Sequence, residues 1–207
     1  FGLFSMFIAA VFLPNQAEYK RMLAYSGVEH MGIMALGVGI GGNAIYGALL
    51  HAANHSLVKS GLFLVSGNIL RYFHTRQQKQ ITGAMQIIPA SSVLWVAGFL
   101  GITGTPPFGL FISKFIILRE AIEQGHIWLA ALFLFLLAVI FIAMMSSMLS
   151  MVQGTPPEHI KNPAREHWSL VIPAGALLFL GLALGIYQPE GLVQLLKTIT
   201  QAMGGGI

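Results

Sequence analysis

The sequence predicts an all-α membrane protein, a polytopic bundle of about seven transmembrane helices. Of its 207 residues, 56% are hydrophobic and only 9% are charged, with a mean hydropathy of +0.75. Soluble domains carry about 25% charged residues. The apolar residues form long runs, and a spanning helix needs about 20 of them. The bilayer is thus an expected partner. Nucleic acid is not, because the basic residues stand between apolar runs, as in other membrane proteins.

Seven apolar segments follow one another along the chain. The first ends at Pro14, because proline removes a backbone donor. The expected helices cover about 1–13, 21–41, 44–70, 85–103, 108–124, 127–152 and 168–187, and residues 189–203 are expected to form an interfacial tail. The chain opens inside an apolar stretch without a methionine, so we expect a single transmembrane domain that is a fragment of a longer chain.

The segment from Gly104 to Gly109 breaks a helix, since it holds two prolines between glycines. Non-helical backbone at membrane depth is tolerated only where protein or a water-filled cavity satisfies it. Interrupted segments of this kind point to ion or substrate sites in transporters. Lys114 follows about one and a half turns into the next helix, at roughly 3.6 residues per turn.

Lys59 and Lys114 are the two basic residues that fall inside apolar segments. A charged residue at the centre of a spanning helix costs about 2.5–3.5 kcal/mol on insertion scales, and such residues tend to face the protein interior and mark ion pathways. An ammonium group that has lost its water also releases its proton more easily than a solvated one. Both lysines are therefore candidate proton carriers.

His51, His55 and Lys59 recur every four residues, so they form one stripe on a helix. Histidine suits proton transfer because its unperturbed pKa is about 6.5. A single intramembrane histidine can equally serve only as a hydrogen-bonding residue between helices. A metal held by His51 and His55 would lack an obvious third ligand, and the chain has no cysteine. We expect neither a metal nor a cofactor in this chain.

Glu29 and His30 lie near the middle of the expected helix 21–41. Glu29 is the one acidic residue well inside an apolar segment, so it could act as counter-ion to a buried lysine. A structural hydrogen bond to a neighbouring helix is the alternative, and the sequence leaves both open.

The loop charges suggest a topology. If the seven helices alternate in direction, one side carries most of the basic residues: Lys20, Arg21, Arg71, Arg76, Lys79, Arg119 and Lys197. The other side carries Lys161 and Arg165. The excess of positive charge would make the first side cytoplasmic.

Three ordered motifs resemble the antiporter-like proton-conducting subunits of respiratory complex I, multisubunit cation/proton antiporters and group 4 hydrogenases. They are KRMLAYS at 20–26 with EHMG at 29–32, HAANHSLVKSGLFLVSGN at 51–68, and GTPPFGLFISKF at 104–115. Within this family the chain looks most similar to the large membrane subunit of hydrogenase 4 and formate hydrogenlyase. Members contain two inverted five-helix repeats, and the resemblance places this chain in the C-terminal half, with residues 21–152 as the second repeat.

The resemblance also implies roles for single residues. Lys59 would be the central relay lysine, flanked by His51 and His55, and Lys114 would exchange protons with one aqueous face. Many relatives carry glutamate at this last position. Glu29 would join the relay, and the supporting residues of the first motif would be His30, Lys20 and Arg21.

The function expected from the residues and the resemblance is proton translocation within a redox-driven complex. The chain would be a subunit of an oxidoreductase or translocase rather than a redox catalyst itself. Its partners would be other membrane subunits and a soluble redox arm, and it would lie in the inner (plasma) membrane. The alternatives are a subunit of a cation/proton antiporter and a non-conducting scaffold that docks a redox module.

Overall fold

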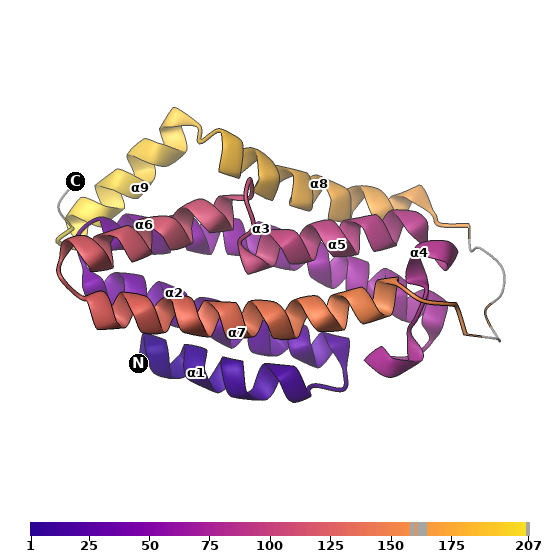
Figure 1. The fold of residues 1–207 in the computed structure, drawn as a ribbon. Helices are drawn as coiled ribbons and strands as arrows, with labels where there is room; N and C mark the ends of the chain where they lie inside the picture. The colour runs from indigo at the N-terminus through magenta and orange to yellow at the C-terminus, as the bar shows by residue number, and fades with distance from the viewer. Residues whose placement is uncertain (158–159, 161–164, 206–207) are drawn as a thin grey trace.

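The computed structural model describes residues 1–157, 160 and 165–205, and this part of the chain forms an elongated bundle of α-helices without a strand (Figure 1). The long helices are α1 (Gly2–Phe12), α2 (Tyr19–Ile40), α3 (Asn43–Phe73), α5 (Pro89–Thr103), α6 (Gly109–Glu123), α7 (Ile127–Val152), α8 (Trp168–Ile186) and α9 (Glu190–Ala202). A short helix α4 (Ala84–Ile87) and two 3₁₀ turns, η1 (Leu13–Asn15) and η2 (Gln78–Gln80), lie in the connections. The predicted all-α fold class is confirmed.

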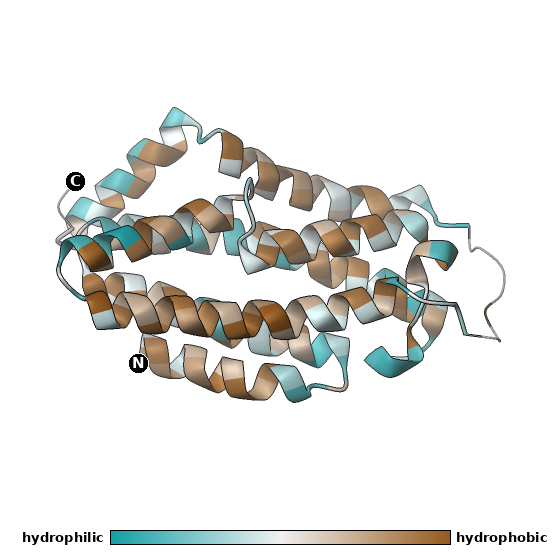
Figure 2. Ribbon diagram, in the orientation of Figure 1, coloured by the Kyte–Doolittle hydropathy of each residue, from teal (hydrophilic) through white to brown (hydrophobic). Residues whose placement is uncertain are grey.

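The outer surface of the bundle is apolar along its middle, as a membrane protein requires. Figure 2 shows hydrophobic residues along the helices and hydrophilic residues at both ends. By length and composition, α2, α7 and α8 can each cross a membrane, and α1 with η1 and α5 are shorter apolar helices. Large side chains such as Phe135 and Ile142 on α7 and Phe179 on α8 point outward, where lipid chains would cover them.

Helix α3 is the central element, since it contacts α2, α5, α6 and α8. Its 31 residues span about 46 Å, longer than the roughly 30 Å hydrocarbon core. It ends three residues later than expected, at Phe73, and His74 closes it in the left-handed conformation with φ of 53°. Arg71 can stay in the last turn because a long basic side chain reaches water from there.

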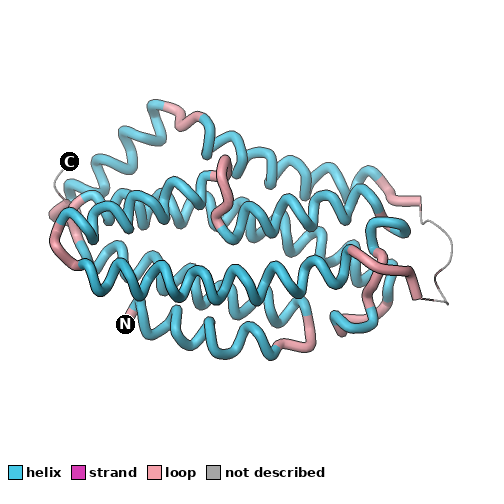
Figure 3. The backbone as a smooth tube through the Cα atoms, in the orientation of Figure 1, coloured by secondary structure: helices cyan, strands magenta, loops and turns pink. Residues whose placement is uncertain are grey.

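Helices α5 and α6 are two halves of one interrupted span. The amide of Gly83, just before α4, donates to Gln153 at the end of α7 (2.8 Å), whereas a short turn joins the end of α6 to the start of α7. The two halves therefore follow one another along α7, and each 15-residue half covers only about 22 Å. Figure 3 shows their loop at the middle of the bundle rather than at an end. The predicted break between Gly104 and Gly109 is confirmed.

This continuity overturns the expected distribution of basic residues. Because α5 and α6 do not reverse direction, Arg119 and Lys197 lie at the opposite end from Lys20, Arg71 and Lys79, and Arg165 joins the latter group. Lys161 lies outside the described residues. The end of the bundle that holds the C-terminus of α3 is thus the strongly basic one, and the positive-inside rule makes it the expected cytoplasmic end.

Glu166 caps α5 from a distant part of the chain. Its two carboxylate oxygens accept hydrogen bonds from the backbone amides of Ala90 (2.7 Å) and Ser91 (2.9 Å). The first amides of a helix have no partner within the helix, and a carboxylate there also meets the positive end of the helix dipole. Glu166 therefore ties the segment that precedes α8 to the start of the interrupted span.

Replacing Glu166 with glutamine is expected to lower the free energy of unfolding by about 1–3 kcal/mol, because hydrogen bonds to a charged acceptor are worth about twice neutral ones. Denaturant titration of the purified full-length protein measures the change. Glu190→Gln, at an exposed carboxylate in the first turn of α9, is the matched control. An equal effect of both substitutions would contradict the role of Glu166 as a cap.

Candidate functional site

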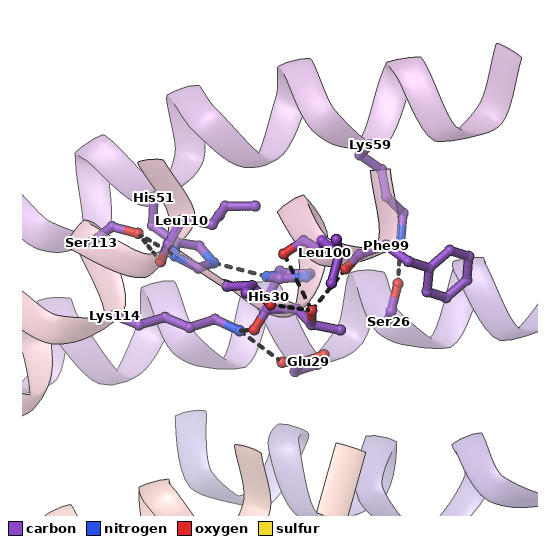
Figure 4. Close-up of polar contacts among 12 residues, drawn as sticks. Ser26, Glu29, His30, His51, Lys59, Phe99, Leu100, Leu110, Ser113 and Lys114 are labelled. Carbon is purple, nitrogen blue, oxygen red and sulfur yellow. Dashed lines mark hydrogen bonds and ion pairs between the residues drawn. The ribbon is translucent and has the colours of Figure 1, made fainter. Parts of the chain in front are cut away.

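Ionisable and polar side chains from α2, α3 and α6 meet in the middle of the bundle. Figure 4 shows Lys114 and Lys59 on opposite sides of His30, with Glu29 and His51 close to this histidine. Each of the main predicted relay residues is at most 9% exposed, namely Glu29, His51, His55, Lys59 and Lys114. Burial of so many ionisable groups in one place carries a large desolvation cost, which sets this cluster apart from ordinary helix packing.

Lys114 bridges α6, α2 and the break. Its Nζ lies 3.5 Å from Oε1 of Glu29 and donates to the carbonyl of Thr103 at 3.1 Å. Thr103 is the last residue of α5, where carbonyl groups lack partners within the helix and the helix dipole favours a positive charge. The break thus supplies an acceptor that a continuous helix would use internally. Of the two alternatives for Glu29, the structure favours the counter-ion, with Lys114 as its partner.

His30, His51 and Ser113 form a hydrogen-bonded row. Nδ1 of His30 lies 2.9 Å from Nε2 of His51, and Nδ1 of His51 lies 2.8 Å from Oγ of Ser113. The Leu110 carbonyl lies 2.9 Å from Oγ of Ser113. In the arrangement in which the serine donates its one hydroxyl proton to this carbonyl, its oxygen accepts from His51. With both rings neutral, His51 then carries its proton on Nδ1 and accepts the Nδ1 proton of His30. Every donor in the row points from α2 through α3 to α6.

His51, His55 and Lys59 lie on one helix, α3, but no hydrogen bond joins them to one another in the described residues. The rings of His51 and His55 lie 6.3 Å apart between centroids, whereas the His30 ring lies 5.1 Å from the first and 4.5 Å from the second. His30, expected only as a supporting residue, therefore stands between the two. Nε2 of His30 and Nε2 of His55 have no hydrogen-bond partner among the described residues, so both nitrogens are free to take part in a further contact.

Lys59 differs from Lys114 in its partners. Its Nζ donates to the carbonyl of Leu23 and to Oγ of Ser26, both on α2. Ser26 in turn donates to the Leu23 carbonyl at 2.9 Å, so its oxygen is an acceptor for the lysine. The Phe63 ring lies 5.7 Å from the same nitrogen. Within the described residues Lys59 forms no ion pair, and only neutral oxygens and a ring face contact its head.

The other supporting residues do not join the cluster. Lys20 and Arg21 lie in the first turn of α2, about 12–14 Å along the helix axis from Glu29 at 1.5 Å per residue. Sequence reasoning had also missed Ser26, Ser113 and Thr103, whose roles depend on helix contacts. In the parts of the chain that the structure describes, no three histidine or acidic side chains are arranged to hold a metal ion.

A broken helix, a buried lysine–glutamate pair and a histidine row inside a spanning bundle define an antiporter-like membrane subunit. The family model described as "NADH:quinone oxidoreductase/Mrp antiporter, TM" matches residues 1–141, and the chain belongs to this family. The membership predicted from the three motifs is confirmed.

Relatives of several kinds support this assignment. The chain is 34% identical to the hydrogenase-4 component F homolog of Methylacidiphilum infernorum over 93% of its own length and 40% of the relative's. It is 33% identical to NADH-quinone oxidoreductase subunit N of Desulforudis audaxviator over 83% and 35%, respectively. For the Na(+)/H(+) antiporter subunit A1 of Staphylococcus epidermidis the identity is 31% over 63% and 18%. The chain thus spans two fifths or less of these relatives.

Solved structures agree on the fold. Respiratory complex I from Thermus thermophilus contains a chain with a TM-score of 0.81 and 26% identity, covering 99% of this chain and 44% of that one. An archaeal respiratory membrane complex, the membrane-bound sulfane sulfur reductase, gives a TM-score of 0.86 at 24% identity over 94% and 32%. Both are multisubunit membrane complexes, and the chain is a membrane subunit of this antiporter-like type.

Proposed function

We propose that this chain carries part of a proton path across the membrane, as a subunit of a redox-driven complex. The observation that carries the proposal is the buried row of proton-binding groups on three helices. It comprises the Lys114–Glu29 pair, the His30–His51–Ser113 hydrogen bonds and Lys59 on the far side. A scaffold that only docks a redox module would have no use for side chains this expensive to bury.

The chemistry of each part suits a step in such a path. Lys114 and Glu29 can pass a proton between them, which converts an ion pair into two neutral groups and back. The two histidines can accept a proton on one ring nitrogen and release another from the opposite nitrogen. Lys59 can bind a proton without an opposite charge to retain it, because neutral oxygens surround its head.

The proposed driving force is a redox reaction in partner subunits. The hydrogenase-4 homolog matches 93% of this chain, whereas the antiporter subunit matches 63%. We therefore place the chain beside further membrane subunits and a soluble redox arm in a plasma membrane. Charge changes in neighbouring subunits would raise or lower the proton affinity of Lys114 and Lys59 in turn.

The test measures proton uptake into vesicles that contain the complete complex, driven by its own redox substrate. Lys59→Ala is expected to reduce uptake to the background rate while redox turnover partly survives. This variant strands no buried counter-charge, because Lys59 has no ion-pair partner in the described part of the chain. Lys79→Ala, at an exposed lysine, is the control and should pump normally.

Three other outcomes would each overturn a part of the proposal. Normal pumping by Lys59→Ala in a fully assembled complex would contradict the relay. Loss of assembly on a native gel without any change in ion movement would favour the scaffold. Proton movement driven by a sodium gradient in the absence of redox substrate would favour the antiporter.

A further inference from the structure

A cavity of about 340 Å³ opens at the end of the bundle where α3 begins and α6 ends. Its lining residues come from α3, α6 and α9, and six of the seven are of polar or charged type: Asn43, Tyr46, Ile116, Arg119, Glu120, Glu123 and Lys197. Figure 2 shows this end of α6 and one side of α9 as hydrophilic. Side chains of both charge signs therefore line the cavity at a hydrophilic end of the bundle, where water can enter it.

The α6 wall of this cavity continues along the helix toward the histidine row. Ser113, Ile116 and Glu120 lie three and seven residues apart and so share one face of α6. The carboxylate of Glu120 is therefore about 10 Å along the helix from the serine that His51 contacts, at 1.5 Å per residue. Ile116 stands between them and is only half-buried.

On the facing side of α3, Gly47 allows close packing against α6. This residue lies one turn before His51, and a Cβ atom there would come within 2.9 Å of Ile117, 3.1 Å of Ile116 and 3.2 Å of the Ser113 carbonyl. The absence of a side chain at position 47 lets α3 and α6 approach closely and leaves Ile116 as the apolar layer between cavity and serine.

Helix α9 forms the third wall. The hydroxyl of Tyr46, on α3, donates to Oε1 of Gln188 in the link between α8 and α9 (2.9 Å). Gly205, just after α9, packs so closely on Gly42 that a Cβ atom would lie 2.9 Å from the Gly42 carbonyl. The amphipathic helix is thus held at both ends beside the cavity, and Lys197 projects from its middle.

We propose that this cavity is an aqueous mouth of the proton path, with Glu120 and Glu123 exchanging protons with water and Ile116 forming the apolar barrier next to Ser113. The proposal rests on the function proposed above and adds the place where the path meets water. A second cavity, between α6 and α7, also reaches Lys114. Its lining is almost entirely apolar and includes Phe111, Phe115, Phe133 and Phe141, so it suits lipid chains rather than water.

Thiol labelling tests the mouth directly. The 207 residues contain no cysteine, so Ile116→Cys introduces the one thiol of this segment. In the full complex, a membrane-impermeant trimethylammonium methanethiosulfonate applied to both faces is expected to modify it. The fixed positive charge should then slow proton uptake by the vesicles about tenfold or more, since like charge in a cleft repels a cation that passes through it. A small neutral methanethiosulfonate should slow it less.

Two controls separate the mouth from the relay. Ile142→Cys, 67% exposed on the outer side of α7, should resist the charged reagent because lipid covers it. Glu120→Gln combined with Glu123→Gln should slow uptake at low buffer concentration, and Glu190→Gln should not. The proposal that the cavity is an aqueous mouth would be contradicted by an Ile116→Cys protein that stays unmodified, or by one that pumps at full rate once modified. If Lys59→Ala still stops pumping in that case, the relay stands without it.

Discussion

Replacing Glu29 with glutamine is expected to lower the free energy of unfolding by about 3–5 kcal/mol, because it leaves the buried ammonium of Lys114 without its charge partner. Glu29 is 2% exposed and Lys114 6% exposed, so water cannot replace the lost carboxylate. The same change should reduce proton uptake to background. Glutamine can still accept a hydrogen bond but cannot bind and release a proton in the accessible pH range.

Denaturant titration in mixed micelles and redox-driven uptake in vesicles measure the two effects separately. The double variant Glu29→Gln/Lys114→Met removes both charges, so it should recover most of the lost stability and none of the uptake. Glu18→Gln, at the N-cap residue of α2, controls for the loss of a carboxylate at the start of the same helix. A double variant as unstable as the single one would contradict a stabilising ion pair.

Gly185→Ala should disrupt the break that positions Lys114. Position 185 lies near the end of α8, and a Cβ atom there would meet the backbone of the α5–α6 loop, 2.0 Å from the Pro107 carbonyl oxygen and 2.5 Å from the Gly109 nitrogen. Backbone cannot move aside as a side-chain tip can, so we expect a loss of about 1–3 kcal/mol from overpacking. Proton uptake should fall as well, because this loop directly follows Thr103, the last residue of α5, whose carbonyl accepts from Lys114.

Gly175→Ala on the same helix is the matched control. Its Cβ atom would find only Leu94, at an ordinary 3.7 Å. Alanine favours a helix over glycine by about 1 kcal/mol, so this variant should be neutral or slightly more stable. Equal behaviour of the two alanine variants in unfolding and uptake would show that the contact of α8 with the break has no consequence.

Sequence patterns could predict the parts of the site that reside in one helix. The i, i+4 spacing of His51, His55 and Lys59 gave the stripe on α3, and the prolines after Gly104 gave the break. Both the stripe and the break follow from the geometry of a single helix, which residue spacing and proline positions are enough to predict. The family motifs added the role expected of Lys114, on the helix that follows the break.

The rest depends on which helix faces meet, which spacing within a chain does not encode. Glu29 paired with Lys114 although 85 positions separate them, and His30 lies against His51 across 21. Ser113 lies in the third motif, but its contact with His51 was not predicted, because a serine in an apolar run usually bonds its own helix. The expected sidedness of Arg119 was wrong for a related reason, since a sequence break does not reveal whether a chain turns back or continues.

If the proposed proton path runs through the His30–His51–Ser113 row, the uniform direction of its donors would limit how many protons it passes. When a proton enters at one end and another leaves at the other, each ring is left with its proton on the opposite nitrogen. The row then has reversed polarity and cannot pass a second proton the same way until its groups turn back. Each reorientation of the row would allow one proton to pass. The transport rate of this segment would then be set by the reorientation of its groups rather than by proton hopping.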